Sequence, residues 1–571
     1  MAGQPKRRLR HRIPVRIRHN YRLLAACATF LLVITVVLGS TRIRPYVTSA
    51  ADSATDVVTI DIAGTVDLFD STVAHEFSLV FRDDDYQRLL DAYFDDGEKE
   101  YLEADLVVDG TAIPSVGIRL KGNSTLGGLT RDGETAQRAG GQFGGGEGQP
   151  GGGRQFGGGQ GQPGGGEGQP GGGEGQPGGA PQGGGPGGGM GMAGLAAEEP
   201  ETLPWLISFD EFVDGRRYQG LQEVAVRVGG MGGGAAVANE ALALSLLATA
   251  GMTTQRYAYT SFTVNDRPTT ARLVVEHPDE QYAAGVGTSG VLYKSLASGS
   301  FDYQGEDLVE YQDDFKQINL TGSQDLQPVI NLIRWLSEAS DEEFDAELAD
   351  HVDVESFARY VAAQNLLLNF DDMAGPGRNY YLYYDLDTRK FTVISWDHNL
   401  TFSGDATSGP NDAIGMGGFG RPGTAQEGGE PGTAQEGGEP GAGFQPPEGF
   451  QPPEGFQPPE GFQPPEGFQP PEGFQPPGGG EQQGGGPGGR MMGHPLKERF
   501  LASEAFTEVY EAAYRDLYQQ MYASGAATAT LDGLAAVLTT VDGQDAQAAT
   551  EEIDQLRTLV TERTESLRDQ V

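Results

Sequence analysis

The chain has 571 residues and a formal net charge of −42, and 37% of its residues are hydrophobic, so it can build a sizeable core. Glycine is concentrated in two tracts, so the part that folds is shorter than the whole. Because phosphate binding relies on Lys and Arg, so acidic a body is expected to repel nucleic acid, and no nucleic-acid partner is predicted. The single cysteine, Cys27, excludes an intramolecular disulfide.

The N-terminus has the pattern of a membrane anchor. Residues 1–22 are rich in Arg and Lys and contain no acid, and residues 23–40 are apolar and uncharged. This apolar length is near the lower end of the roughly 17–25 residues that span a bilayer as a helix. The positive-inside rule then predicts a single-pass signal-anchor in the cell membrane, with residues 1–22 in the cytoplasm and the body outside, after a tether over residues 41–56. The alternative is a cleaved signal peptide, which would release the body as a secreted protein.

A globular pattern begins at residue 57, and two strands are predicted around the turn at Asp109. The second strand ends in Arg119, Lys121 and Asn123. These donors have two interpretations. They form a phosphate-facing edge, or they are the charges of an edge strand that discourage pairing with other sheets.

Two low-complexity tracts interrupt the globular pattern. Repeats such as GGGEGQP over residues 131–200 predict a disordered insertion, because so much glycine cannot repay its ordering entropy. A second tract over residues 403–490 contains GFQPPE repeats, whose phenylalanines either bind a wall or matrix partner or have no partner. Residues 491–571 are predicted to form helices that pack on the core through apolar stripes.

Between the tracts, a strand, the glycine-rich turn at residues 229–234 and a helix form an arrangement that can cradle an anion. The specificity of this signal is low, because the chain uses glycine in many places. Glu240, on the first turns of the helix, is expected to pair with a strand cation, either Lys121 or Arg227. Near residue 325 the chain changes from strand-rich to helix-rich, which is typical of a small sheet lobe followed by a helical lobe.

Acidic and amide side chains are densest over residues 365–402, at the ends of apolar elements. A helix ending near Phe370 is predicted, followed by two strands joined by a turn. The polar side chains at the ends of these elements are Asp371, Asp372, Asn379 and Asp397. A buried carboxylate is costly unless it is paired or binds a cation, which indicates a metal or proton-transfer site. The alternative is an ordinary hairpin with solvated turn acids.

A set of motifs in this order resembles the CotH kinase family of spore-coat and surface proteins. The motifs are RLKGNST, ISFDEF, NEALALSLLATAGM, VVEHPD, NFDDMAGPGRNYYLYYD and ISWDHNLTF. The resemblance runs from residue 57 to the C-terminus, with the two tracts as insertions. It implies an α+β, reduced two-lobed protein-kinase-like fold with its core in residues 57–402. It also implies an atypical kinase that uses ATP and Mg²⁺ or Mn²⁺ to phosphorylate serine in coat proteins or in itself.

The resemblance also implies roles for individual residues. Asp371 matches the catalytic aspartate, with Asp372 as the neighbouring candidate, and Asn379 and Asp397 match metal ligands. An Asp that orients the attacking hydroxyl, together with an Asp and an Asn on the metal, is the set that phosphoryl transfer needs.

Further positions concern the nucleotide. Glu240 would be the helix glutamate that positions a lysine, and Glu276 would lie near the adenine edge. Asn399 stands where many relatives have a second acid, which removes one charge from the metal site. The candidates for the phosphate-binding cation are Lys121, Arg227 and Lys294.

The sequence therefore predicts a membrane-anchored, extracytoplasmic protein kinase whose partners are ATP and a protein substrate on the cell surface or coat. The alternative is a non-catalytic, pseudokinase-like envelope or coat scaffold. A polysaccharide hydrolase is a weaker interpretation, because adjacent Asp371 and Asp372 do not establish the opposed carboxylates that it needs. Asn123, Asn319 and Asn399 each begin an N-x-S/T triplet, which matters only in a glycosylating host.

Overall fold

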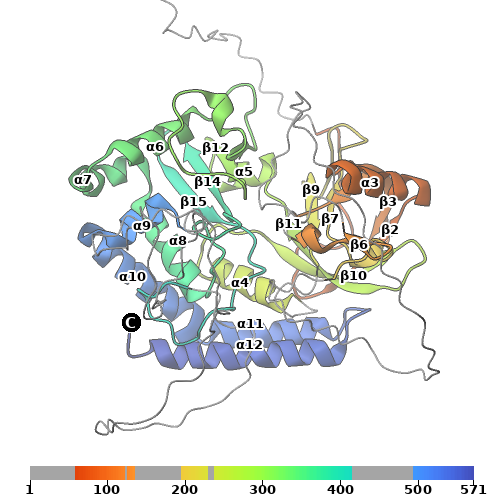
Figure 1. Ribbon diagram of the computed structural model, residues 1–571. Helices are drawn as coiled ribbons and strands as arrows, with labels where there is room; N and C mark the ends of the chain where they lie inside the picture. The colour runs from red at the N-terminus through yellow and green to blue at the C-terminus, as the bar shows by residue number, and fades with distance from the viewer. Residues whose placement is uncertain (1–57, 123–124, 136–193, 229–236, 415–492) are drawn as a thin grey trace, which may run out of the picture. The chain divides into compact units, whose positions relative to one another are not determined.

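The computed structural model describes residues 58–122, 125–135, 194–228, 237–414 and 493–571. The predicted basic segment, membrane anchor and tether lie outside these residues, as do the turn at residues 229–234 and most of both low-complexity tracts. No helix in the described part of the chain is long and apolar enough to cross a membrane. The architecture is α+β, as predicted (Figure 1).

The first half of the described chain folds into a closed β-barrel. Its strands, in their order around the barrel, are β10 (Tyr257–Val264), β11 (Thr270–Glu276), β9 (Glu223–Val226), β7 (Trp205–Ser208), β4 (Thr111–Leu120), β3 (Leu102–Val108) and β2 (Ala74–Val80). The barrel closes through the parallel pair of β10 and β2, while its other pairs are antiparallel. Alternating side chains such as Phe77, Leu106 and Trp205 fill a continuous apolar core.

Strand β4 pairs with β3 on one side and with β7 on the other. It is therefore an interior strand, and the interpretation of Arg119 and Lys121 as charges that protect a free edge is wrong. Helix α3 (Asp83–Asp96) packs its Leu89 and Leu90 into the barrel core. Smaller pairs accompany the barrel: β1 (Ile60–Ile62) lies parallel to β8 (Arg216–Tyr218), and β5 (Thr130–Arg131) pairs with β6 (Glu134–Thr135).

A second sheet has the order β13 (Phe315–Gln317), β12 (Gly290–Ser295), β14 (Tyr380–Asp385) and β15 (Phe391–Ser395). Two of these strands precede residue 325 and two follow it, so the helix-rich half shares a sheet with the strand-rich half. One face of this sheet contributes to the large helical core, and the other packs against Tyr282 of α5 (Glu280–Val286).

The helices between the strands are α4 (Ala238–Thr249), α6 (Gln327–Glu338), α7 (Asp341–His351) and α8 (Val354–Leu366). Helix α4 has no distinct polar face in its sequence, which is typical of a helix that is buried on nearly every side, as α4 is. Helix α8 is preceded by its N-cap Asp353, whose carboxylate accepts a hydrogen bond from Ser356 N–H, and it ends at Leu366 rather than near Phe370. Leu368 has a φ of 51°, which stops the helix before the acidic residues.

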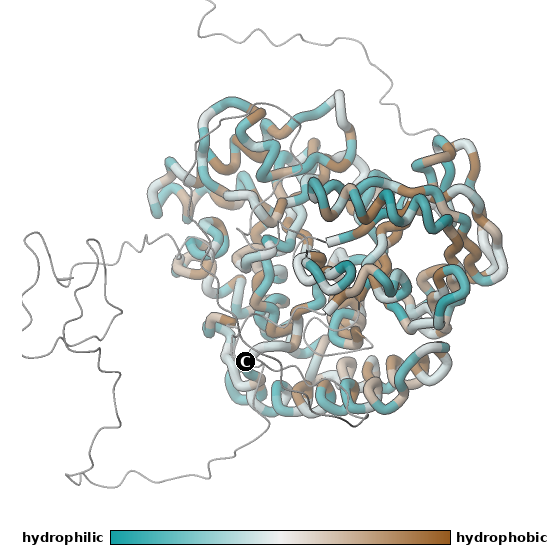
Figure 2. Tube along the Cα trace, turned by 45° about the vertical axis from the view of Figure 1, so that its right-hand side comes forward, coloured by the Kyte–Doolittle hydropathy of each residue, from teal (hydrophilic) through white to brown (hydrophobic). Residues whose placement is uncertain are grey.

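The C-terminal helices contribute buried residues to the large helical core. They are α9 (Pro495–Ala502), α10 (Thr507–Tyr518), α11 (Ala526–Leu538) and α12 (Ala546–Leu567). Helix α11 lies against both α4 and α12. Hydrophobic and hydrophilic residues intermingle along these helices in Figure 2, and their buried residues belong to the same core as α4 and α8.

Candidate functional site

Trp396, directly after β15, is surrounded by cations from three strands of the chain. Nζ of Lys121, at the end of β4, lies 5.1 Å from a ring centroid of Trp396, and Cζ of Arg227, just after β9, lies at the same distance. Nζ of Lys294, in β12, lies 5.8 Å away. Stacking on an aromatic ring stabilises these charges where water is scarce. The sequence-predicted cations are thus brought together around one indole.

Arg227 links this cation cluster to two carboxylates. Its Nη2 donates to Oε1 of Glu240 at 2.7 Å, and its Nη1 lies 3.3 Å from Oδ1 of Asp397. Glu240 is only 1% exposed. Burial raises the pKa of Glu240 to about 6, the Arg227 guanidinium opposes this shift, and the charge of Asp397 adds to it. The expected ion pair of Glu240 is therefore formed with Arg227, not with Lys121.

The two lysines of the cluster are partly buried and close to other cations. Burial lowers the pKa of Lys294 to about 8, with further contributions from Lys316, Arg119 and Arg227. Burial also lowers the pKa of Lys121 well below its usual range, helped by the charge of Lys294. An anion between these groups would relieve their mutual repulsion, so the cluster is electrostatically suited to a phosphate group.

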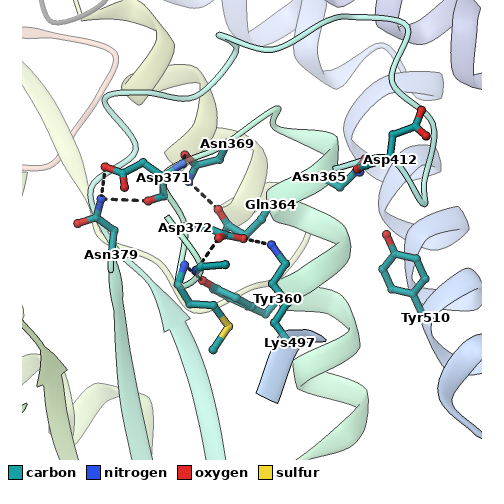
Figure 3. A network of polar contacts seen from close by, with 12 residues as sticks. Tyr360, Gln364, Asn365, Asn369, Asp371, Asp372, Asn379, Asp412, Lys497 and Tyr510 are labelled. Atoms are coloured by element: carbon teal, nitrogen blue, oxygen red, sulfur yellow. Dashed lines mark hydrogen bonds and ion pairs between the residues drawn. The ribbon is translucent and has the colours of Figure 1, made fainter. Parts of the chain in front are cut away.

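The second part of the site is the loop between α8 and β14, which we call the aspartate loop, residues 371–379 (Figure 3). Asp371 accepts a hydrogen bond from Gly377 N–H at 2.6 Å and another from Nδ2 of Asn379 at 2.9 Å. A Cβ atom on Gly377 would lie 2.6 Å from Oδ2 of Asp371, so only glycine lets the loop wrap this carboxylate. Asn369, bonded to Gln364 of α8, accepts from the Asp371 N–H at 3.1 Å and fixes the start of the loop.

Burial raises the pKa of Asp371 to about 6. The charges of Asp397 and Asp372 raise it further, whereas the hydrogen bonds from Gly377 and Asn379 lower it. A carboxylate with this pKa is mostly ionised at neutral pH and retains some basicity, which suits a proton acceptor.

Asp372 has a different environment from its neighbour. Its side chain is 2% exposed, forms an ion pair with Lys497 of α9 and accepts a hydrogen bond from Ala374 N–H at 2.8 Å. Figure 3 shows Asp371 directed towards Asn379 and Asp372 directed towards Lys497. Of the two sequence candidates for the catalytic carboxylate, Asp371 is therefore the one that lies beside Asn379.

Oxygen ligands for a divalent cation are available at Asp371, Asn379 and Asp397. Oδ1 of Asp397 is buried and accepts no hydrogen bond from the described residues, although Arg227 lies nearby. The backbone of Asp397 has a φ of 57°, in the left-handed region that is uncommon for residues other than glycine, and this conformation sets the direction of its side chain. The described residues contain no group of three or more His, Cys, Asp or Glu that could hold a metal. Two carboxylates and an amide nevertheless fit Mg²⁺, which proteins commonly hold with one or two carboxylates together with substrate phosphates.

Two other predicted site residues have different surroundings. Glu276 is paired with Arg256, whose Nη2 lies 2.6 Å from Oε1 and whose backbone N–H donates to Oε2 at 3.1 Å. Asn399 provides its backbone carbonyl to Nδ2 of Asn239 at 2.7 Å. The N-x-S/T residue Asn319 is buried and bonded to β12 through Leu292 N–H, so its side chain is not available to a glycan in this fold.

The sequence reasoning missed His277, His398 and Lys497. His277 lies edge-on to Trp396 at 5.8 Å between centroids. His398 is fully buried, burial lowers its pKa to about 4, and its ring nitrogens have no hydrogen-bond partner among the described residues. His277 lies in the motif VVEHPD and His398 in the motif ISWDHNLTF. Their place inside these motifs is the sequence signal that could have identified them as site residues. Nothing near Lys497 in the sequence marks it.

Comparison with known proteins adds one positive finding. The family model described as CotH kinase protein matches residues 196–438, a range that contains Arg227, Glu240, the aspartate loop and Asp397. None of the curated proteins that were searched matches the chain. The resemblance predicted from the sequence is therefore confirmed over residues 196–438, where the chain is similar to the CotH kinase family.

Proposed function

We propose that this protein is an atypical protein kinase that transfers the γ-phosphoryl group of ATP to serine or threonine hydroxyls of a surface or coat protein, or of itself. The observation that carries the proposal is the convergence of two halves of a site. Asp371 and Asn379 lie in the aspartate loop, and Asp397 is joined through Arg227 to the cations around Trp396. Phosphoryl transfer uses carboxylates that bind a metal and accept a proton, together with cations that bind the phosphates. Groups of both kinds lie close together here.

In this proposal Asp371 accepts the proton of the acceptor hydroxyl. A bond forms between the hydroxyl oxygen and the γ-phosphorus, the bond from that phosphorus to the bridging oxygen breaks, and ADP leaves with the electron pair. Lys121, Arg227 and Lys294 bind and orient the phosphates. Asp397 and Asn379 would hold Mg²⁺ or Mn²⁺, whose charge offsets that of the phosphates when bound.

The proposed location is the outer side of the cell membrane, with residues 23–40 as the anchor. The distribution of charge along the chain supports this location, because a basic segment precedes the apolar segment and an acidic body follows it. A kinase-like arrangement of two lobes, with the barrel as the first and the helices as the second, belongs to the same proposal.

The test is phosphoryl transfer by the full-length protein with Mg²⁺ or Mn²⁺ and labelled ATP. We expect labelling of the protein itself or of an added acceptor, and its loss in Asp371→Asn and in Asp397→Asn. The matched control is Asp387→Asn, an exposed acid in the turn of the same hairpin, which should label like the wild type. Equal labelling in the wild type and in Asp397→Asn would exclude the proposed site.

A non-catalytic scaffold is the rival function, and nucleotide binding separates the two. A ligand at a hundred times its dissociation constant adds about 2.7 kcal/mol to the free energy of unfolding. A kinase should therefore show a Mg²⁺-dependent thermal shift with ATP that Asp397→Asn lacks, whereas a scaffold should show none.

A further inference from the structure

The aspartate loop is in contact with a segment that lies far away in the sequence. Lys497, in the first turn of α9, pairs with Asp372, which lies 125 positions earlier in the sequence, and its side chain is 21% exposed. The partner carboxylate is 2% exposed and also accepts a hydrogen bond from Ala374 N–H. Lys497 is thus the cation that offsets a buried charge in the loop, and it lies outside residues 196–438, which the family model matches.

Two neighbours of Lys497 make further contacts, one with the loop itself and one with the strand that follows it. Gly493 N–H donates to the carbonyl of Ala374 at 2.8 Å. Nε2 of His494, which is fully buried, lies 3.1 Å from the hydroxyl of Tyr380, the first residue of β14. The segment that leads into α9 therefore contacts the loop at Asp372 and Ala374 and the strand after it at Tyr380, so it is not attached at a single point.

The position of Asp372 constrains that of Asp371, because the two residues are adjacent. On the far side of Asp372, Met373 N–H donates to the hydroxyl of Tyr360 in α8 at 3.1 Å. If the ammonium of Lys497 were lost, Asp372 would remain buried without a cation, and the loop would relax to hydrate it. Such a movement displaces Asp371 from Asn379, to which it is hydrogen bonded.

We propose that Lys497 is a positioning residue of the site: through its ion pair with Asp372 it holds Asp371 where the acceptor hydroxyl gives up its proton, a role that rests on the proposed function. The segment after the second low-complexity tract then contributes a residue to the site, although it lies outside the range that the family model matches.

The kinetic test uses the full-length protein with Lys497→Met and Lys497→Arg. Methionine keeps much of the length without the charge, so kcat should fall by about 100-fold, the scale of a 1 Å misplacement. The KM for ATP should stay close to that of the wild type, because the phosphate cations are untouched. Arginine keeps the ion pair and should restore most of kcat. A wild-type kcat in Lys497→Met, or a rise in KM alone, would overturn the proposal.

Arg499 provides the matched control on the same helix. Its guanidinium holds α9 to the carbonyls of Leu336 and Ser340 and to Asp341, and not to the aspartate loop. Arg499→Met should therefore leave kcat unchanged. A loss equal to that of Lys497→Met would mean that any weakening of α9 has the same effect, and it would remove the specific role of Lys497.

Hydrogen exchange separates this proposal from the proposed function. The amides of Ala374 and Gly377, which donate to Asp372 and Asp371, should exchange faster in Lys497→Met than in the wild type or Arg499→Met. If the wild type transfers no phosphate, the proposed function fails, and exchange alone decides whether Lys497 holds the loop. Unchanged exchange at both amides would overturn that claim.

A double variant covers the case in which Lys497→Met does not fold. Adding Asp372→Asn removes the buried charge that would drive the loop to relax, so the double variant should fold. The loop still lacks the ion pair that holds it in place, so kcat should stay below that of the wild type. Full kcat in this variant would show that the pair does not position Asp371.

Discussion

The guanidinium of Arg227 donates to the carboxylate of Glu240 at 2.7 Å, at a place where the carboxylate is 1% exposed. The same guanidinium lies 3.3 Å from Asp397, so one side chain holds together strand β9, helix α4 and the end of the hairpin. The stability of the fold and the binding of nucleotide are therefore expected to depend on the same residue.

Arg227→Met should lower the free energy of unfolding by about 3–5 kcal/mol, because it leaves Glu240 buried without its cation. Adding Glu240→Gln should recover part of this loss without restoring ATP binding, because the proposed phosphate cation is still missing. Urea unfolding and ATP titration measure the two effects. If the double variant bound ATP like the wild type, Arg227 would not be a phosphate ligand.

Lys294 should make ATP binding dependent on pH. Its pKa of about 8 means that the free protein loses this positive charge as the pH rises above 8, so the affinity for ATP should fall there. Lys294→Arg keeps its charge, and its affinity should stay level between pH 7 and pH 9. Titrations at several pH values measure this, and parallel pH profiles for the two proteins would rule out a role for Lys294.

Asp279 provides a test of stability that does not depend on function. It caps α5 by accepting from Tyr282 N–H, and burial raises its pKa to about 6. An acid whose folded pKa exceeds its unfolded pKa of 3.8 favours folding when protonated, so its contribution is lost as the pH rises from about 4 to about 6. A shift of this size corresponds to about 3 kcal/mol.

Asp279→Asn keeps an acceptor for the cap but carries no charge. Its free energy of unfolding should therefore change less between pH 4 and pH 7 than that of the wild type. Chemical denaturation at these two pH values measures the difference. An identical pH dependence in both proteins would mean that Asp279 ionises normally in the folded state.

Arg563 of α12 is fully buried and donates to backbone carbonyls on both sides of the site hairpin. Its Nη2 donates to the carbonyl of Asn365 at 3.0 Å and its Nη1 to that of Ala406 at 3.2 Å. Arg563→Met should cost at least 3 kcal/mol of stability, because each buried carbonyl left without a donor costs about 1–3 kcal/mol. Arg557→Met on the same helix removes an exposed pair with Asp532 and should cost less than about 1 kcal/mol.

Local patterns predicted much of the fold. The motifs NYYLYYD and KFTVISWD became β14 and β15, and the helix before them formed, although it ended earlier than expected. Apolar periodicity is a local signal, so elements of this kind can be identified from neighbouring residues alone. The closed barrel could not be identified in this way, because its closure depends on β2 and β10, whose paired residues are about 185 positions apart.

The candidate site shows the same limit. Residues in the quoted motifs, such as Asp371 and Asp397, could be selected from their sequence alone. The different surroundings of Asp371 and Asp372 depend on the ion pair between Asp372 and Lys497. The pairing of Glu240 with Arg227 depends on the position of β9 relative to α4. Such pairings are set by tertiary packing, which a single sequence does not display.

The contacts around the second low-complexity tract allow its length to change. At the start of the tract, ahead of the repeats, Nδ2 of Asn365 donates to the carbonyls of Gly409 and Asp412, and after the tract Gly493 N–H donates to the carbonyl of Ala374. Both flanks are therefore attached to the folded body by their own hydrogen bonds. The number of GFQPPE copies between them sets no distance inside the site, so gain or loss of whole repeats is a route by which this protein can vary in sequence while the contacts of the site stay the same.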